Sequence, residues 1–406
     1  MSNLNHELKP FVLRKFAHNK GYDPIKWSLD DFPKWLKKDV IRLRVASTSH
    51  EQGKIMFEKM CLSVILKPQQ FVNWLKDDYV IPYEHGNIVP STHWAYYDYK
   101  PAAENFTQEF TEALSFDKLG IKGEFNDETI WIGSPGAYTP CHYDSYGYNL
   151  HLQLKGTKRW IVFPPETELS PSRIPYEEST IYSLFDITGG QLPSTGPQNC
   201  YCIYLEEGDL LFIPPKWWHS VQCFKGDIKN GGVFSVNKWF PIESDEKEKK
   251  KECIVGCLTS LINPEYFEDD KEEQFTNLES IISEVFQMQQ SLDLEEVPLN
   301  KKSRMEDESK YGESKMMKFY NEYLPVAEKL PQMSFDELKR EMSSNHYKIF
   351  DKKTTVTDKE FMMSPIVIPS SEDVLLYPNN IRKMLNAFTN DSTLEHVIKL
   401  MQNEDI

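Results

Sequence analysis

The chain has 406 residues, 40% of them hydrophobic and 27% charged, which is ordinary for a globular protein. Its net charge of −16 opposes tight, sequence-independent binding to nucleic acid or to a membrane, because both require an excess of Lys and Arg. The sequence has no run of the roughly 20 apolar residues that span a bilayer, and residues 1–20 have no signal-peptide pattern. Seven scattered cysteines fit no complete disulfide framework, so we expect reduced thiols and a cytoplasmic protein with access to the nucleus.

The first 115 residues mix short strand-like and helical segments. Residues 11–13 and 41–45 have the pattern of strands, and residues 71–75 have the pattern of a helix start. We therefore expect residues 1–115 to form an N-terminal α/β portion that packs on the following region.

Residues 116–245 are rich in short strands separated by turn signals. The predicted strands cover residues 129–132, 149–154, 159–163, 209–213 and 233–237. Two predicted hairpin turns lie at residues 155–158 and 206–209. Many short strands with little helix between them indicate an antiparallel sandwich or barrel.

Residues 246–406 show helical spacing, which predicts a helical C-terminal region with a polar linker near residues 295–314. Two capping-box signatures predict later helix starts, at Ser334 with Glu337 and at Ser392 with Glu395. The C-terminal helices are candidates for a homodimer contact, but no sequence feature decides the oligomeric state.

The strongest local motif is Thr139-Pro140-Cys141-His142-Tyr143-Asp144. On a strand, residues two apart project to the same face, so His142 and Asp144 can share one metal ion. Such a triplet is common by chance and needs a third ligand. His219 is the candidate, because it follows an apolar strand that a separate part of the barrel would supply. Two imidazoles and a carboxylate leave three coordination positions open, as in non-haem Fe(II) oxygenases.

With these residues in place, the sequence resembles the JmjC-domain family of cupin-like 2-oxoglutarate oxygenases. The resemblance covers residues 85–245 well and extends more weakly back to residue 10. The strings that carry it, besides the motif above, are residues 155–160 with 163–165, 208–219 and 235–239. Residues 172–179 and 94–100 are most similar to the small-heat-shock-protein-associated JmjC subfamily.

The resemblance implies a mainly β core, a double-stranded β-helix of the jelly-roll or cupin type with flanking α elements. It implies that His142, Asp144 and His219 bind Fe(II), and that 2-oxoglutarate and O₂ are cosubstrates. The distal carboxylate of 2-oxoglutarate is then assigned to Lys158 and Thr139.

Other pocket positions also follow from the resemblance. Asn149 and Asn237 are expected near the cosubstrate and the iron. The family often adds a tyrosine from the segment before the barrel, and Tyr96, Tyr97 and Tyr99 all remain candidates here.

The expected activity is hydroxylation of a protein side chain. Lysine demethylation ranks lower because no histone-reader module accompanies the domain, and a nucleic-acid substrate ranks lower because the chain is acidic. Two alternatives belong to other classes. The chain could be a scaffold that binds a small heat-shock protein through a cupin shell with little or no catalysis, or a zinc-bound cupin with hydrolytic or isomerase chemistry.

Overall fold

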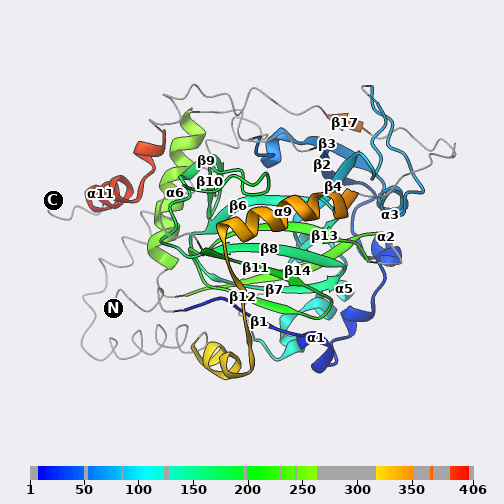
Figure 1. The fold of residues 1–406 in the computed structure, drawn as a ribbon, viewed down its shortest axis with the longest axis horizontal. Helices are drawn as coiled ribbons and strands as arrows, with labels where there is room; N and C mark the ends of the chain where they lie inside the picture. The colour runs from blue at the N-terminus through cyan, green and yellow to red at the C-terminus, as the bar shows by residue number, and fades with distance from the viewer. Residues whose placement is uncertain are drawn as a thin grey trace.

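The protein is described from a computed structural model, which covers residues 8–49, 54–84, 86–122, 128–194, 199–227, 231–242, 245–262, 317–350, 366–368 and 385–401. Two antiparallel sheets form its body (Figure 1). One hydrophobic cluster joins residues of both sheets, such as Leu211 of the larger and Val162 of the smaller, so the sheets face each other across a common core. The predicted linker near residues 295–314 lies outside the described residues.

The larger sheet has ten strands in the order β15-β1-β12-β7-β14-β5-β4-β2-β3-β17. Its strands are β1 (Phe11–Leu13), β2 (Ile41–Ser47), β3 (Leu62–Leu66), β4 (His93–Pro101), β5 (Thr129–Gly133), β7 (Tyr148–Lys155), β12 (Leu210–Ile213), β14 (Val233–Phe240), β15 (Glu328–Lys329) and β17 (Ile366–Ile368). Strands from the N-terminal 115 residues therefore continue the sheet that the middle of the chain begins.

The smaller sheet has seven strands in the order β16-β11-β8-β13-β6-β10-β9. Its strands are β6 (Tyr138–Asp144), β8 (Thr157–Phe163), β9 (Pro171–Glu177), β10 (Thr180–Ser183), β11 (Asn199–Leu205), β13 (Trp218–Lys225) and β16 (Gln332–Ser334). This arrangement confirms the predicted mainly β, jelly-roll or cupin-like fold with flanking helices.

Helices flank the two sheets (Figure 1). The α-helices are α1 (Phe16–Asn19), α2 (Phe32–Trp35), α3 (Pro68–Leu75), α4 (Ala102–Asn105), α5 (Gln108–Leu114), α6 (Asp245–Ile262), α9 (Phe335–Phe350) and α11 (Asp391–Met401). Short 3₁₀ turns are η2 (Asp23–Lys26), η3 (Leu29–Asp31), η4 (Glu58–Met60), η5 (Phe116–Leu119) and η7 (Leu324–Val326). Among the described residues, no helix combines the length and apolarity needed to cross a membrane.

The two predicted hairpin turns are corners between sheets. β7 pairs with β12 and β14, whereas β8 pairs with β11 and β13, so residues 155–158 join strands of different sheets. Residues 206–209 likewise lead from β11 in the smaller sheet to β12 in the larger. The hairpin prediction was wrong because turn residues show where a strand ends and leave open which strand it pairs with.

A distant C-terminal segment closes one edge of each sheet. β15 pairs with β1 and β16 pairs with β11, and Leu330 between them is buried in the core shared by the sheets. Open sheet edges are aggregation-prone, so this pairing protects both. α9 then lies across the outer face of the smaller sheet, where Phe335 and Leu338 pack against Ile161 (Figure 1).

One of the two predicted capping boxes is present at the predicted place. Ser334 N donates to Glu337 Oε2 at 2.7 Å, and Glu337 N donates to Ser334 Oγ at 3.2 Å, at the start of α9. The prediction for α11 was displaced by two residues. Asn390 caps that helix by accepting from Thr393 N at 3.1 Å, because an asparagine amide is an equally good acceptor at this position.

Candidate metal and cosubstrate site

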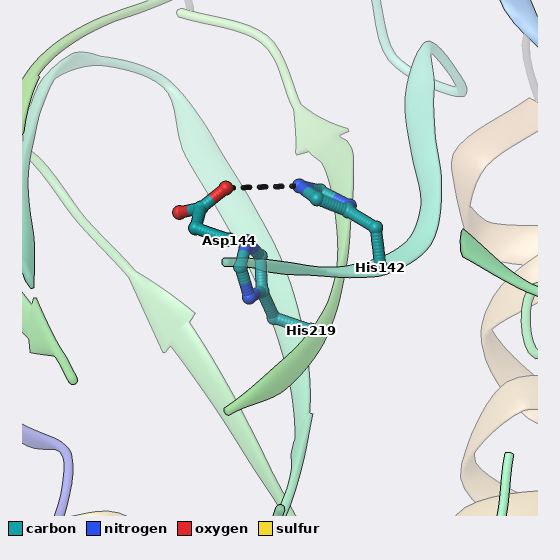
Figure 2. A group of neighbouring side chains, drawn as sticks. All are labelled: His142, Asp144 and His219. Carbon is teal, nitrogen blue, oxygen red and sulfur yellow. Dashed lines mark ion pairs between the residues drawn. The ribbon is translucent and has the colours of Figure 1, made fainter. Parts of the chain in front are cut away.

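Three side chains from two neighbouring strands converge inside the barrel. His142 and Asp144 lie at the end of β6, and His219, near the start of β13, is directly opposite His142 in the pairing of the two strands. One ligand-type atom from each residue lies within 4.8 Å of the others, and all three residues are buried. Figure 2 shows the side chains turned toward one another. The structure therefore brings together the three residues that the sequence predicts as metal ligands.

Both imidazoles are held by the same kind of hydrogen bond. His142 Nδ1 lies 2.8 Å from Pro140 O, and His219 Nδ1 lies 2.9 Å from Trp217 O. Because a carbonyl oxygen only accepts, each Nδ1 carries the proton and each Nε2 keeps its lone pair for another ligand. Burial is the main cause that lowers the pKa of His142 to about 4, and the neighbouring His219 contributes to the same decrease. The His142 imidazole is therefore neutral near pH 7, and the neutral form is the one that binds a metal.

Asp144 is oriented by donors from two other strands. Its Oδ2 accepts from Trp239 Nε1 at 2.9 Å and from Asn149 Nδ2 at 3.4 Å. Asn149 Oδ1 in turn accepts from Asn237 Nδ2 at 2.9 Å. The other carboxylate oxygen faces His142 Nε2 at 3.9 Å, which is too long for a hydrogen bond. These two atoms face one another without bonding directly, as expected of ligands that share an ion.

Lys158 lies deep in the barrel, where its side chain meets two polar groups. The residue is only 1% exposed, and its Nζ donates to Tyr96 Oη at 3.1 Å. The side chain of Thr139 also hydrogen-bonds the Tyr96 hydroxyl. In the part of the chain that the structure describes, no carboxylate forms an ion pair with Lys158. A buried ammonium is costly without a counter-ion, so this position fits the carboxylate of a bound ligand.

Several other polar atoms in the barrel have no hydrogen-bond partner. Among the described residues these include His151 Nε2, Trp160 Nε1 and Ser235 Oγ. The Trp160 ring stacks on His219 with centroids 5.4 Å apart and meets the edge of His151 at 4.8 Å. Buried polar atoms are normally bonded, so unbonded ones beside the candidate ligands fit a polar molecule or water held there. The donor set therefore suits both Fe(II) and a 2-oxoglutarate dianion.

A β-bulge places Thr139 on the same face as the metal ligands. By simple alternation, Thr139 would point to the opposite face from His142. In the pairing with β13, however, His142 is opposite His219 and Thr139 is opposite Val221. Between these two pairs β6 advances three residues and β13 advances only two. The extra residue in β6 reverses the alternation of its side chains between the two faces.

The three candidate tyrosines have separate environments. Tyr96 points inward and bonds Lys158, whereas Tyr97 points outward and packs against Phe32 with ring centroids 5.6 Å apart. Tyr99 sits at a second bulge, in β4, with φ 52°, and is 57% exposed. Of the three, Tyr96 is the one beside the predicted cosubstrate lysine.

Two tryptophans complete the site and were not singled out from the sequence. Trp239 bonds Asp144 as described above, and Trp131 Nε1 donates to Asn237 Oδ1 at 2.7 Å. Their rings also flank Tyr99, at 6.0 Å and 5.8 Å between centroids. Strand alternation could have identified Trp239 from the sequence, because it follows Asn237 by two residues and therefore projects from the same face of the strand.

Comparison with known proteins gives one consistent result. The profile of the cupin-like domain family matches residues 6–246. HSPB1-associated protein 1 from Bos taurus is 34% identical over 245 residues, which are 58% of this chain and 49% of that protein. The Danio rerio homolog of that protein is 31% identical over 299 residues, 70% of this chain and 65% of the relative. Lysine-specific demethylase JMJ30 from Arabidopsis thaliana is 30% identical over 128 residues, 30% of this chain and 28% of that protein. The chain thus spans about half of the Bos taurus relative.

Proposed function

The chain belongs to the cupin-like domain family, and on that premise we propose that it is an Fe(II)- and 2-oxoglutarate-dependent oxygenase that hydroxylates a protein side chain. The proposal rests on one observation, which is that two features occur together inside one barrel. The buried cluster of His142, Asp144 and His219 offers a facial set of metal ligands. The buried Lys158 offers a positive charge that lacks a carboxylate partner among the described residues.

The residues of the chain then have distinct tasks. The Nε2 atoms of the two histidines and one oxygen of Asp144 would hold Fe(II), which when bound supplies the redox chemistry that couples O₂ to oxidation of a C–H bond. Lys158, with the hydroxyls of Tyr96 and Thr139, would bind the distal carboxylate of 2-oxoglutarate. The protein's own contribution is to orient the reacting groups and to exclude water from them.

The net reaction balances without another reductant. One C–H group, 2-oxoglutarate and O₂ give a C–OH group, succinate and CO₂. If the oxidised carbon is an N-methyl group, the hydroxylated product releases formaldehyde, and the outcome is demethylation. Hydroxylation of a protein side chain is preferred because the Arabidopsis relative named as a demethylase covers only 30% of this chain.

Substrate-independent turnover tests the proposal without knowledge of the protein substrate. The purified chain, supplied with Fe(II), ascorbate and 2-oxoglutarate in air, should form succinate slowly. His142→Ala should abolish this, whereas His93→Ala should not, because the only hydrogen bond of the His93 side chain among the described residues is with Thr92 Oγ1, at 2.9 Å. Equal succinate formation by wild type and His142→Ala would reject the assignment.

A second candidate function rests on the relatives. The names of the Bos taurus and Danio rerio relatives describe proteins associated with HSPB1, and we propose that this chain also binds a small heat-shock protein, as substrate or as partner. A scaffold should retain that partner in the His142→Ala variant, and the partner should gain no oxygen atom by mass spectrometry. Gain of one oxygen that depends on His142 would identify the partner as a substrate.

A further inference from the structure

Helix α6 presents one polar face to the loops that follow the candidate metal ligands. Asp245, Glu248 and Glu252 are spaced by three and four residues, so they project from the same side of the helix. The three form hydrogen bonds or ion pairs with residues next to the ligand strands. All but the first two residues of α6 lie beyond the cupin-like match, which ends at residue 246. Glu248 and Glu252 therefore lie outside the residues that the family match covers.

The first contact fixes the turn between β6 and β7. Asp245 is 4% exposed, and its Oδ1 accepts from Gly147 N at 2.8 Å. Gly147 has φ +70°, and an added Cβ would lie 3.3 Å from Phe240 O. The turn that starts immediately after Asp144 is thus held against the start of α6.

The second contact holds the residue next to Asp144. Glu252, 2% exposed, accepts from Ser145 Oγ at 3.1 Å through Oε1 and from Ser179 N at 3.3 Å through Oε2. Ser145 N also donates to Ser179 O at 2.8 Å. Arg173, 4% exposed, pairs with the same Glu252 oxygen that Ser145 uses. The backbone and the side chain of Ser145 are therefore both fixed.

The third contact is with the segment that precedes His219. Glu248 Oε1 accepts from Lys216 Nζ at 3.2 Å, and Lys216 N donates to Asp144 O at 2.9 Å. Lys216 has φ 65° and lies three residues before His219. One helix thus contacts the segments that carry two of the three candidate ligands, from different strands.

α6 also has apolar contacts, which are separate from its polar face. Val255 of α6 and Leu394 of α11 are both completely buried in one cluster, against which Tyr176 of β9 also packs. A buried ion pair such as Arg173 with Glu252 adds little to stability compared with apolar packing, because both charges lose their hydration. Such pairs are better explained by the geometry that they impose.

We propose that α6 is a positioning element for the metal centre, and that Glu252 acts through Ser145 to hold Asp144 in ligating geometry. The inference rests on the proposed function, because it requires that the triad bind a metal. Side chains that orient metal ligands typically change metal affinity about 10- to 100-fold when they are replaced. Glu252 touches no ligand directly and is a positioning residue.

Cobalt(II) is a suitable probe, because its visible d–d bands report ligand geometry and the binding isotherm gives an affinity without turnover. The metal-free full-length chain would be titrated anaerobically as wild type, Glu252→Gln and Ser145→Ala. The matched control is Glu395→Gln, which removes a charge from α11 that pairs with Lys247 at 2.8 Å and with Lys251 at 3.6 Å but contacts neither ligand loop. Thermal unfolding of each metal-free variant is measured in parallel.

The expected result is a loss of Co(II) affinity of about tenfold or more in both Glu252→Gln and Ser145→Ala, with altered d–d bands. Glu395→Gln should bind as wild type does. If Glu252→Gln does not fold, Ser145→Ala decides, because it removes a single hydroxyl. Unchanged affinity and bands in Ser145→Ala would overturn the positioning role. Failure of wild type to bind Co(II) would instead reject the metal centre, and the inference with it.

Discussion

Replacing Lys158 by methionine has two expected effects of opposite sign. Burial lowers the pKa of Lys158 from 10.5 to about 8, against the opposing influence of Cys223 and Asp98. A decrease of this size corresponds to about 3 kcal/mol by which the charged lysine destabilises the cosubstrate-free protein. Methionine fills similar space without a charge, so Lys158→Met should be more stable than wild type by up to about this amount near pH 7.

The gain in stability should depend on pH in a defined direction. The folded-state pKa of Lys158 is about 8 and the ordinary value is 10.5, so the unfolded chain binds more protons between these pH values. Wild-type stability therefore rises with pH across this window relative to the variant. The difference between the two proteins should be largest below pH 8 and should vanish above pH 10.5. Urea unfolding at a series of pH values measures it.

The second effect is on the cosubstrate. Removing one partner of a buried charge pair costs about 2–5 kcal/mol, so 2-oxoglutarate should bind Lys158→Met about 30-fold more weakly or worse. Calorimetric titration of the Co(II)-loaded protein measures this affinity. Lys155→Met is the control, because Lys155 Nζ donates to Ile25 O at 2.8 Å and to Glu207 at 3.2 Å, outside the site. A Lys158→Met protein that is less stable than wild type and binds 2-oxoglutarate normally would contradict both expectations.

Three further changes have expected outcomes. Tyr96→Phe removes the hydroxyl that bonds the buried ammonium and should weaken 2-oxoglutarate binding by about 1 kcal/mol, roughly fivefold; Tyr97→Phe should leave it unchanged in the same titration. Trp239→Phe removes a donor to Asp144 and should lower Co(II) affinity by about tenfold, and an unaltered isotherm would contradict this role. Leu330→Ala, in the segment that closes both sheet edges, should lower the free energy of unfolding by about 2–5 kcal/mol, and unchanged urea stability would show that this closure contributes nothing.

The candidate ligands could be identified from the sequence because each one lies in a short motif that is recognisable by itself. His142 and Asp144 share a strand face at a spacing of two, and His219 follows its own strand signal. Their convergence also requires β6 and β13 to be neighbours, which the family resemblance supplied and periodicity alone does not.

Bulges limited the prediction of the cosubstrate end of the site. A bulge adds one residue to one strand and reverses every side chain beyond it. Alternation alone would separate Thr139 from His142 and would give Tyr97 and Tyr99 the same face. The placement of Tyr96 beside Lys158 therefore required coordinates.

Long-range pairing was the other feature that local patterns did not reveal. β15 and β16 are two and three residues long and lie more than 100 residues beyond the strands that they cover. Such short segments have too few residues for a period to be detected. The same reasoning applies to the polar face of α6, whose acidic residues resemble an ordinary solvated charge run in the sequence.

The most direct test of the oxygenase assignment is an anaerobic titration of the metal-free protein with Fe(II) and then 2-oxoglutarate, followed by visible absorption. We expect a metal-to-ligand charge-transfer band in wild type. The band should be absent in His142→Ala and should appear only at higher 2-oxoglutarate in Lys158→Met. Absence of the band in a folded, Fe(II)-loaded wild-type protein would contradict the assignment.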